Sequence, residues 1–302
     1  MKLKLSVMLV STLLSGGAMA KDLVIEHYMG STKISDAPKR VVVIGHGALD
    51  ALDYLGIEPV AVAKAPIMPQ YLDKFQDAKY ASAGSLFEPD FETIYSQKPD
   101  LIIIGPRATS KYKELSEIAP TIVFSADLKQ GYWQSTQKQW RNMGEIFNAQ
   151  QKIEQKISQL NEEFAAIKQY NQKNQVDALT IMTSGGNITT FGSQSRFASV
   201  YEDFGFKESS SNVKTNNHGD IISYEYINKA NPSTLLVIDG DKLSGKGNQV
   251  EEQYLDNDLV KATNAYKNKR ITLLDLDAWY LSISGISATE KMVSDIKETV
   301  EL

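Results

Sequence analysis

The sequence predicts an α/β protein built from two similar lobes with parallel-rich sheets, joined by one long rigid helix, with a ligand cleft between the lobes. Three observations support this fold class: short apolar runs alternate with helical patterns, one helix–turn–strand unit occurs twice, and one long amphipathic segment separates the copies. The chain has 302 residues, of which 42% are apolar and 23% are charged. That length and composition suit a globular protein with one large or two medium domains.

Short apolar runs mark the predicted strands. They are continuous rather than alternating, which is typical of strands that are covered on both faces in a parallel sheet. Helical patterns, for example at residues 48–55 and 289–300, accompany them, and strands that alternate with helices predict parallel α/β sheets. The runs outside the repeated unit lie at residues 41–45, 60–63, 121–124, 179–183 and 271–275.

The repeated unit occupies residues 91–107 (FETIYSQKPDLIIIGPR) and residues 224–240 (YEYINKANPSTLLVIDG). Each copy predicts a short helix, a turn with a proline and a buried strand. In both copies a glutamate, Glu92 or Glu225, lies seven residues before the proline. Chance similarity between such units is common, but the identical spacing favours a duplication.

A single long helix is predicted between the copies, at residues 149–173. Its apolar residues recur in steps of four, three, four and three, which places them on one helix face. About 24 residues would form a rod of roughly 36 Å. The segment lacks the glycine and serine of a flexible linker and is short for a coiled coil, so we expect a stiff connection between lobes at residues 21–148 and 174–302.

The first twenty residues predict a secretory signal peptide that is cleaved after Ala20. Lys2 and Lys4 precede a short apolar stretch that ends in small residues, and the stretch is too short to span a membrane. A buried N-terminal helix is the alternative. The chain has no cysteine, so neither disulfides nor a lipid anchor on a cysteine is expected. These features predict a monomer that is free in the periplasm and not embedded in the membrane.

The charge balance bears on the class of partner. Without Lys2 and Lys4, 30 basic and 37 acidic residues remain, a net charge of −7. This balance argues against nucleic acid as a partner. It does not exclude an anionic ligand, because a local basic patch can oppose the net charge.

Residues that directly follow predicted strands are the candidates for ligand binding. Ligands of open parallel sheets bind beyond the carboxyl ends of the strands. A histidine in the loop TNNHGDII, ahead of the second copy of the repeat, should reach the same cleft. The candidates are His46, Arg107, His218, Gly240, Asp241, Trp279 and Tyr280.

At these positions the sequence resembles a known family. The stretches APKRVVVIGHGALDALDYLGI, FEPDFETIYSQKPDLIIIGPR, KELSEIAPTIVF, FGSQSRFASVYEDFGF, HGDIISYEYINKANP and DLDAWYLSISG are similar to periplasmic substrate-binding proteins of iron–siderophore ABC transporters, the class with a rigid interlobe helix. The resemblance covers essentially the whole mature chain. It is closest to the catecholate binders of enterobactin- and vibriobactin-type uptake.

The resemblance implies a role for individual residues. His218 and Tyr280 match the family's direct iron ligands, and Arg107 and Arg196 match arginines that line the pocket and balance the charge of the ligand. Trp279 is a further candidate for siderophore contact. Glu92 and Glu225 match a pair, one per lobe, that docks to arginines of the inner-membrane permease. Gly240 departs from the family, which often has a third arginine there; Lys242 or Lys246 could supply charge instead, without the planar fork of an arginine.

The chemistry of ferric iron agrees with this set. Fe³⁺ is a hard cation that favours anionic oxygen, and imidazole is an acceptable ligand. A catecholate siderophore with four donor oxygens leaves two coordination positions, which His218 and Tyr280 would fill. A ligand with six donors leaves none, and its binding would rest on the arginines. The pair therefore favours tetradentate ligands, and no permanently bound cofactor is expected beyond the Fe(III)–siderophore itself.

Other interpretations stay open. His218 could be a plain loop residue, Tyr280 or Trp279 could belong to the core, the arginines could form structural ion pairs, and Glu92 and Glu225 could be solvated helix residues. The same fold could bind a hydroxamate or mixed-ligand siderophore, haem or cobalamin. A secreted siderophore esterase would need a nucleophilic serine, and the G-x-S-x-G elbow is missing. We therefore expect a binding protein rather than an enzyme.

Overall fold

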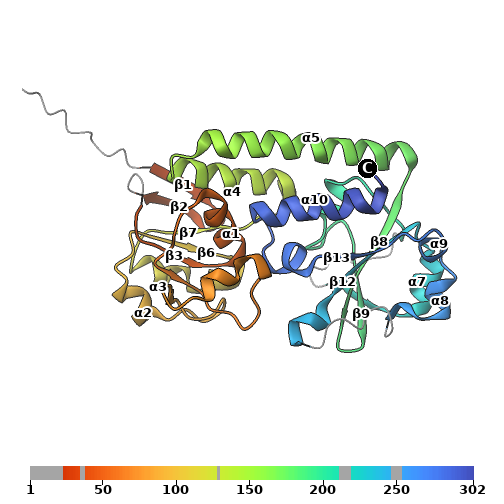
Figure 1. Ribbon diagram of the computed structural model, residues 1–302, viewed down its shortest axis with the longest axis horizontal. Helices are drawn as coiled ribbons and strands as arrows, with labels where there is room; N and C mark the ends of the chain where they lie inside the picture. Colours follow the sequence, from red (N-terminus) through yellow and green to blue (C-terminus); the bar gives the residue numbers. More distant parts are fainter. Residues whose placement is uncertain (1–22, 35–37, 128–129, 211–218, 246–253) are drawn as a thin grey trace, which may run out of the picture.

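The structure is a computed structural model of the chain, and it describes residues 23–34, 38–127, 130–210, 219–245 and 254–302. Figure 1 shows two α/β lobes side by side, with the helix α5 (Gln150–Asn174) running along both of them. The signal peptide predicted at residues 1–20 lies outside the described residues. Among the residues that are described, no helix combines the length and the apolar character needed to cross a membrane.

The first lobe contains a five-stranded sheet in which every neighbouring pair is parallel. The central strand β3 is buried at all four positions, as its continuous apolar run predicts. The strands in spatial order are β5 (Ala81–Ser82), β4 (Ala61–Val62), β3 (Val41–Ile44), β6 (Leu101–Ile104) and β7 (Thr121–Val123). The other elements are the hairpin β1 (Leu23–His27) and β2 (Gly30–Ile34), the helices α1 (His46–Leu55), α2 (Phe91–Ser96), α3 (Tyr112–Ser116) and α4 (Tyr132–Ile146), and the 3₁₀ helices η1 (Gln70–Gln76) and η2 (Pro106–Lys111).

The second lobe contains a mixed sheet. Strands β8, β12, β13 and β10 pair in parallel, whereas β9 is antiparallel to β8 and β11 is antiparallel to β9. The path of the sheet is β11 (Asp220–Ile222), β9 (Asn187–Phe191), β8 (Asp177–Ser184), β12 (Thr234–Asp239) and β13 (Ile271–Leu274), with β10 (Lys207–Glu208) on β8. The helical elements are α6 (Ser199–Glu202), α7 (Tyr224–Ala230), η4 (Gly240–Ser244), α8 (Asp258–Lys261), α9 (Asn264–Lys267), η6 (Asp277–Leu281) and α10 (Ile286–Val300).

The antiparallel strands are a feature that the sequence analysis missed. Gly185 and Gly186 join β8 to β9, and both have positive φ angles, of 58° and 83°. Two residues with positive φ are what a tight hairpin turn requires, and a Gly-Gly pair between apolar runs is a sequence signal for it. The fold is therefore α/β with parallel-rich sheets, and the second lobe carries an antiparallel edge.

The two copies of the repeated unit occupy equivalent places. In the first, α2 leads into β6, which pairs with β3 and β7; in the second, α7 leads into β12, which pairs with β8 and β13. Both helices begin with a side-chain cap: Asp90 accepts a hydrogen bond from the N–H of Thr93, and Ser223 accepts one from the N–H of Tyr226. The shared spacing in the sequence thus corresponds to a shared structure.

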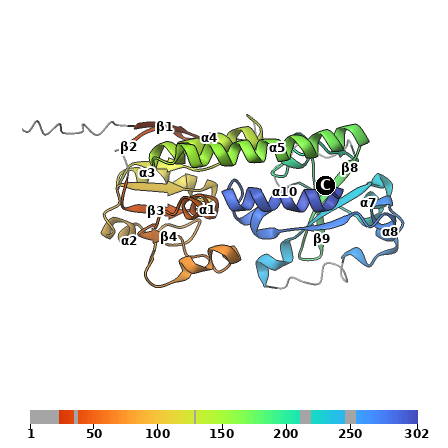
Figure 2. The same cartoon turned by 45° about the horizontal axis from the view of Figure 1, so that its top comes forward.

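Helix α5 lies against helices of both lobes. Its apolar positions Ile153, Ile157, Leu160, Phe164 and Ile167 are buried, and it packs on α4 of the first lobe and on α10 of the second. Figure 2 shows the same arrangement from a second direction. Ion pairs join α5 to α10, from Lys156 to Glu290 at 2.5 Å and from Lys297 to Glu163 at 2.8 Å.

Helix α10 is also tied to the first lobe. Asp50 of α1 accepts hydrogen bonds from the backbone N–H groups of Ser287 and Ala288, both at 2.9 Å, and so caps the amino end of α10. Tyr71 donates to the same carboxylate at 3.0 Å. Burial raises the pKa of Asp50 to about 6. In the opposite direction, Asp277 of η6 accepts a hydrogen bond from the N–H of Gln70 at 2.9 Å, so each lobe contributes a carboxylate to the other.

Candidate ligand-binding site between the lobes

Tyr280 lies beside two guanidinium groups. The guanidinium carbon of Arg196 is 5.0 Å from the centroid of the Tyr280 ring, and that of Arg107 is 5.6 Å from it. Arg107 belongs to the first lobe and the other two residues to the second. All three side chains are partly exposed. The structure therefore brings together three of the predicted siderophore-binding residues, and they meet across the boundary between the lobes.

A fourth side chain extends this arrangement. The ring of Phe87, in the loop before α2, lies 5.9 Å from the guanidinium carbon of Arg107. Aromatic faces attract cations at such distances. Phe87, Arg107, Tyr280 and Arg196 thus form an alternating series of rings and cations, which we call the aromatic–cation row. Sequence analysis missed Phe87, although it begins one of the stretches that carry the family resemblance.

Arg107 is placed by the end of strand β6. Gly105 follows this buried strand, and a Cβ on the neighbouring Gly45 would come within 2.8 Å of the backbone nitrogen of Gly105. Pro106 then begins η2 and turns the chain. Burial lowers the pKa of Arg107, Tyr280 raises it, and the nearby charge of Arg196 lowers it. Two guanidiniums that sense each other's charge form a site that favours an anion.

Arg196 reaches the row from the turn that follows the antiparallel strand β9. The turn is held locally, because the hydroxyl of Ser195 donates a hydrogen bond to the carbonyl oxygen of Gly192 at 2.7 Å. Helix α6 begins only at Ser199, so Arg196 lies ahead of it. The rule that ligand contacts follow the ends of parallel strands would not have found this arginine, and the family resemblance did.

His46 is buried rather than open to the cleft. It is the first residue of α1, its side chain is 2% exposed, and neither ring nitrogen has a hydrogen-bond partner. Burial lowers the pKa of His46 to about 4, and the charge of Arg107 adds to this effect. The imidazole is therefore neutral at neutral pH, and it lies near the row without being accessible to a ligand.

Trp279 requires a correction, because its ring lies in the core. The side chain is fully buried, and its indole N–H donates a hydrogen bond to Asp295 at 2.9 Å. The ring also lies 5.9 Å from that of Phe204. A tryptophan whose polar atom is satisfied by the fold serves packing, so we do not retain it as a contact residue.

His218 lies outside the described residues, as does Lys246. The chain is described from the next residue, Gly219, which has a φ of 72°. A Cβ at this position would come within 2.4 Å of the carbonyl oxygen of Thr190. Glycine is therefore required here, and β11, which follows directly, pairs with β9, the strand that precedes Arg196.

Gly240 has a steric reason to lack a side chain. A Cβ would come within 2.4 Å of the carbonyl oxygen of Thr183 and within 2.6 Å of the methyl carbon of Met182. The neighbouring Asp241 accepts hydrogen bonds from the N–H of Gly185 at 2.7 Å and from the hydroxyl of Tyr254 at 2.9 Å. The end of β12 is therefore packed against backbone, and it has no room for the arginine side chain that the sequence resemblance led us to look for.

Glu92 and Glu225 occupy matching positions. Each is exposed and lies in the first turn of its helix, α2 or α7. A hydrogen bond from Ser223 lowers the pKa of Glu225, which keeps that carboxylate charged. The two lobes thus present one acidic side chain each from equivalent elements.

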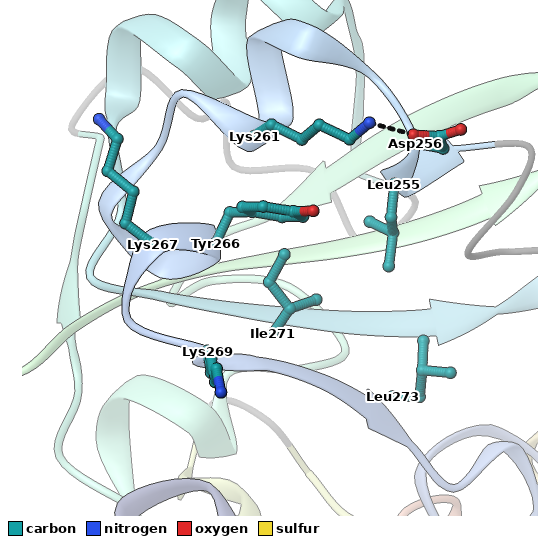
Figure 3. Close-up of a pocket in the computed structure, with 8 residues that line it drawn as sticks. All are labelled: Leu255, Asp256, Lys261, Tyr266, Lys267, Lys269, Ile271 and Leu273. Carbon is teal, nitrogen blue, oxygen red and sulfur yellow. Dashed lines mark ion pairs between the residues drawn. The ribbon is translucent and has the colours of Figure 1, made fainter.

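The second lobe also contains a separate pocket of about 670 Å³, shown in Figure 3. It lies beside β13, and Lys261 forms an ion pair with Asp256 at its rim. No member of the aromatic–cation row lines it. Within the described part of the chain, no group of three or more histidine, cysteine, aspartate or glutamate side chains is arranged to hold a metal ion.

Two α/β lobes are joined by one long helix, and cationic side chains from both lobes meet at the boundary between them. The family model for periplasmic binding proteins matches residues 41–278. The chain therefore belongs to the periplasmic binding protein family.

Individual relatives share most of their length with this chain. The structure of the periplasmic catecholate-siderophore binding protein VctP from Vibrio cholerae has 58% sequence identity and a TM-score of 0.89, covering 92% of this chain and 100% of that chain. The petrobactin-binding protein YclQ of Bacillus subtilis is 38% identical over 93% of this chain and 89% of its own. The ferric-anguibactin-binding protein FatB of Vibrio anguillarum is 31% identical over 91% of this chain and 86% of its own.

Proposed function

We propose that this protein captures a ferric catecholate siderophore in the periplasm and delivers it to an inner-membrane ABC permease, without catalysing a reaction. The observation that carries the proposal is the position of Tyr280 within contact distance of both Arg107 and Arg196, which come from different lobes. A ferric catecholate complex is anionic and carries aromatic rings, and guanidiniums beside rings match both properties. The relative VctP is named for catecholate siderophores, YclQ for petrobactin and FatB for ferric anguibactin.

The arginines would bind and orient the ligand. The two guanidiniums come from different lobes, so one anion that contacts both would hold the lobes together. Because α5 and the Asp50 cap already connect the lobes, we expect the lobes to move little on binding. A small movement suffices to report loading to the permease.

Tyr280 and His218 would complete the coordination of iron in a complex whose siderophore supplies four donor oxygens. Tyr280 belongs to the row, and Gly219, directly after His218, is tied to the strand that leads to Arg196. A tyrosinate oxygen is a hard anionic donor that suits Fe³⁺. Iron enters and leaves this site as cargo, within its siderophore.

The ligand assignment is tested by measuring affinity for three ferric complexes: a bis-catecholate, a tris-catecholate and a hydroxamate. Quenching of intrinsic fluorescence gives each Kd, and visible absorption reports charge transfer from tyrosinate to iron. We expect the bis-catecholate to bind most tightly, with a new absorption band. Binding no tighter than that of the hydroxamate would refute the assignment.

Direct coordination has its own test. His218→Ala and Tyr280→Phe should each weaken binding of the bis-catecholate, and Tyr280→Phe should remove the contribution of tyrosinate to the visible absorption. The tris-catecholate, with six donors of its own, serves as the internal control and should lose much less affinity. If both variants retain the affinity and the spectrum of the wild type, neither residue is an iron ligand.

Docking to the permease would use Glu92 and Glu225. Their equal placement on α2 and α7 presents one negative charge per lobe, which would fix the orientation on a surface with complementary arginines. The double variant Glu92→Lys/Glu225→Lys should abolish uptake while the Kd in solution stays that of the wild type. Exposed Glu117 offers a matched control for charge reversal. Loss of solution affinity in the double variant would instead give these residues a role within the lobes.

Gly240 keeps a second ligand class under consideration. Without the third arginine, the site has one cation fewer than the family's catecholate binders often have. A hydroxamate or mixed-ligand complex carries less negative charge and needs fewer guanidiniums. The comparison of the three ferric complexes distinguishes a catecholate ligand from this alternative, which predicts the highest affinity for the hydroxamate.

A further inference from the structure

Phe87 differs from other exposed apolar side chains because it stands at the end of the aromatic–cation row. Its side chain is 59% exposed, and its ring lies beside Arg107 at 5.9 Å. Arg107 also faces Tyr280, so a single guanidinium contacts two rings. An exposed phenylalanine leaves apolar surface in contact with water, and a ligand that covers the ring removes that surface from water.

The loop that presents Phe87 is fixed by its own hydrogen bonds. The hydroxyl of Ser85 accepts hydrogen bonds from the N–H groups of Phe87 at 3.2 Å and of Glu88 at 2.9 Å. Gly84 has a φ of 88°, and a Cβ there would come within 2.4 Å of the carbonyl oxygen of Glu88. A ring held on such a loop loses little freedom when a ligand binds, which favours affinity.

The chemistry beside Phe87 selects for one kind of ligand. An aromatic ring packs on another ring in an offset or edge-to-face arrangement, and the oxygens of a catecholate can accept hydrogen bonds from the guanidinium next to it. A catecholate offers both features in one planar group. A hydroxamate offers the oxygens without the ring, so only the guanidinium would recognise it.

We propose that Phe87 is a specificity-determining residue that contacts an aromatic ring of the ferric ligand. The inference rests on the proposed function and names the ligand class for the same site, namely ferric complexes that carry aryl rings. The ring of Phe87 takes the apolar face of the ligand while Arg107 takes its anionic oxygens. A ligand without a ring would contact Arg107 but not Phe87, and it would therefore bind less tightly.

The test measures Kd for a ferric bis-catecholate and a ferric hydroxamate in the wild type, Phe87→Ala and Phe87→Leu. We expect Phe87→Ala to weaken binding of the bis-catecholate about tenfold, and that of the hydroxamate less than twofold. Phe87→Leu restores apolar area without the ring, so its affinity for the bis-catecholate should lie between that of Phe87→Ala and that of the wild type. The charge-transfer band of the bound bis-catecholate should persist in both variants, because the iron ligands are unchanged.

Tyr95 supplies the matched control, since it is an aromatic residue of the same lobe with 72% exposure and lies outside the row. Tyr95→Ala should leave both affinities unchanged. Equal weakening of both ligands by Phe87→Ala would mean that Phe87 acts only by supporting Arg107, and unchanged affinities would mean that it contacts no ligand; either result overturns the inference alone. If the wild type binds no ferric catecholate, the proposed function fails first, and this inference fails with it.

Discussion

The ends of strands β6 and β12 make an instructive comparison, because they belong to the two copies of one unit and occupy the same place in their sheets. After β6 the chain passes through Gly105 and Pro106 and delivers Arg107 to the interlobe site. After β12 it passes to Gly240, where a Cβ would meet the carbonyl oxygen of Thr183 at 2.4 Å. One end presents a guanidinium at the boundary between the lobes, and the other is closed by backbone.

The difference shows that two similar units can present different groups at equivalent strand ends. In the second lobe the cation is supplied instead by Arg196, from the turn after the antiparallel strand β9. The first lobe has no antiparallel strand in its five-stranded sheet. The site is therefore charged from both lobes, although only one copy of the repeat provides a charge.

Removal of Arg107 should have the largest effect on binding. Arg107→Ala deletes the guanidinium that contacts both Phe87 and Tyr280, and we expect the affinity for a ferric bis-catecholate to fall about 100-fold, or about 2.7 kcal/mol. Arg196→Ala, which removes the cation of the second lobe, should weaken binding less, by about tenfold. Titrations of both variants followed by fluorescence give these values.

Arg107→Lys is the control for charge, and it should recover only part of the lost affinity, because lysine lacks the planar fork. If Arg196→Ala weakened binding as much as Arg107→Ala, the two lobes would contribute equally to the affinity. The difference between the ends of β6 and β12 would then have no effect on how much each lobe contributes to binding.

Adding a side chain at Gly240 tests the steric half of the comparison. Gly240→Ala and Gly240→Arg should both destabilise the protein, by about 2–3 kcal/mol, because the same Cβ must displace a backbone oxygen. Chemical denaturation gives the free energies of unfolding. Neither variant should bind the siderophore more tightly. A stable Gly240→Arg protein with increased affinity would show that the position can accommodate a side chain. The steric explanation for the glycine would then be wrong.

His46 near the end of β3 should make stability depend on pH. Its native pKa of about 4 lies below the ordinary 6.5, so the unfolded chain binds a proton that the native state refuses, and stability is lost as pH falls below about 6.5. His46→Leu removes this loss, which amounts to about 2 kcal/mol between pH 7.5 and pH 5.

The measurement for His46 is the difference in unfolding free energy between variant and wild type at the two pH values. The comparison with wild type matters, because the pKa of Asp50 and that of Asp203 are both raised to about 6 by burial. Those two carboxyl groups lose stabilisation as pH rises, the opposite direction. A variant with the same pH profile as wild type would mean that His46 takes up its proton at the same pH in the folded and the unfolded protein, and that burial does not lower its pKa.

Much of the fold follows from local patterns. Continuous apolar runs predicted β3, β4, β7, β8 and β13, because strands that are buried on both faces of a sheet consist mainly of apolar residues. The helix expected at residues 149–173 is α5, Gln150–Asn174, and its apolar face was regular enough to define it. The strand predicted at residues 179–183 is part of β8, but β9 was not predicted. The Gly185-Gly186 pair that follows β8 is the hairpin signal that was overlooked.

The site was harder to predict, because it depends on contacts between distant segments. Arg107 and Tyr280 could be found by their positions after strands. Trp279, next to Tyr280, was misplaced because a strand end does not say which of two adjacent rings turns toward Asp295 and the core. Phe87 belongs to a loop with no periodicity, and its importance appears only when Arg107 is seen beside it.

The cap that Asp50 gives to α10 also joins two segments that lie far apart in the sequence. The helix is the final element of the chain, yet its first turn is bonded to α1, and Trp140 of α4 donates its indole N–H to the carbonyl oxygen of Ser284 at 2.8 Å, just before it. Contacts that close so long a loop form late, after the partners nearer in sequence have paired. The amino end of α10 can therefore be capped only after the whole segment between Asp50 and Ser287 has been synthesised and has brought the two lobes together.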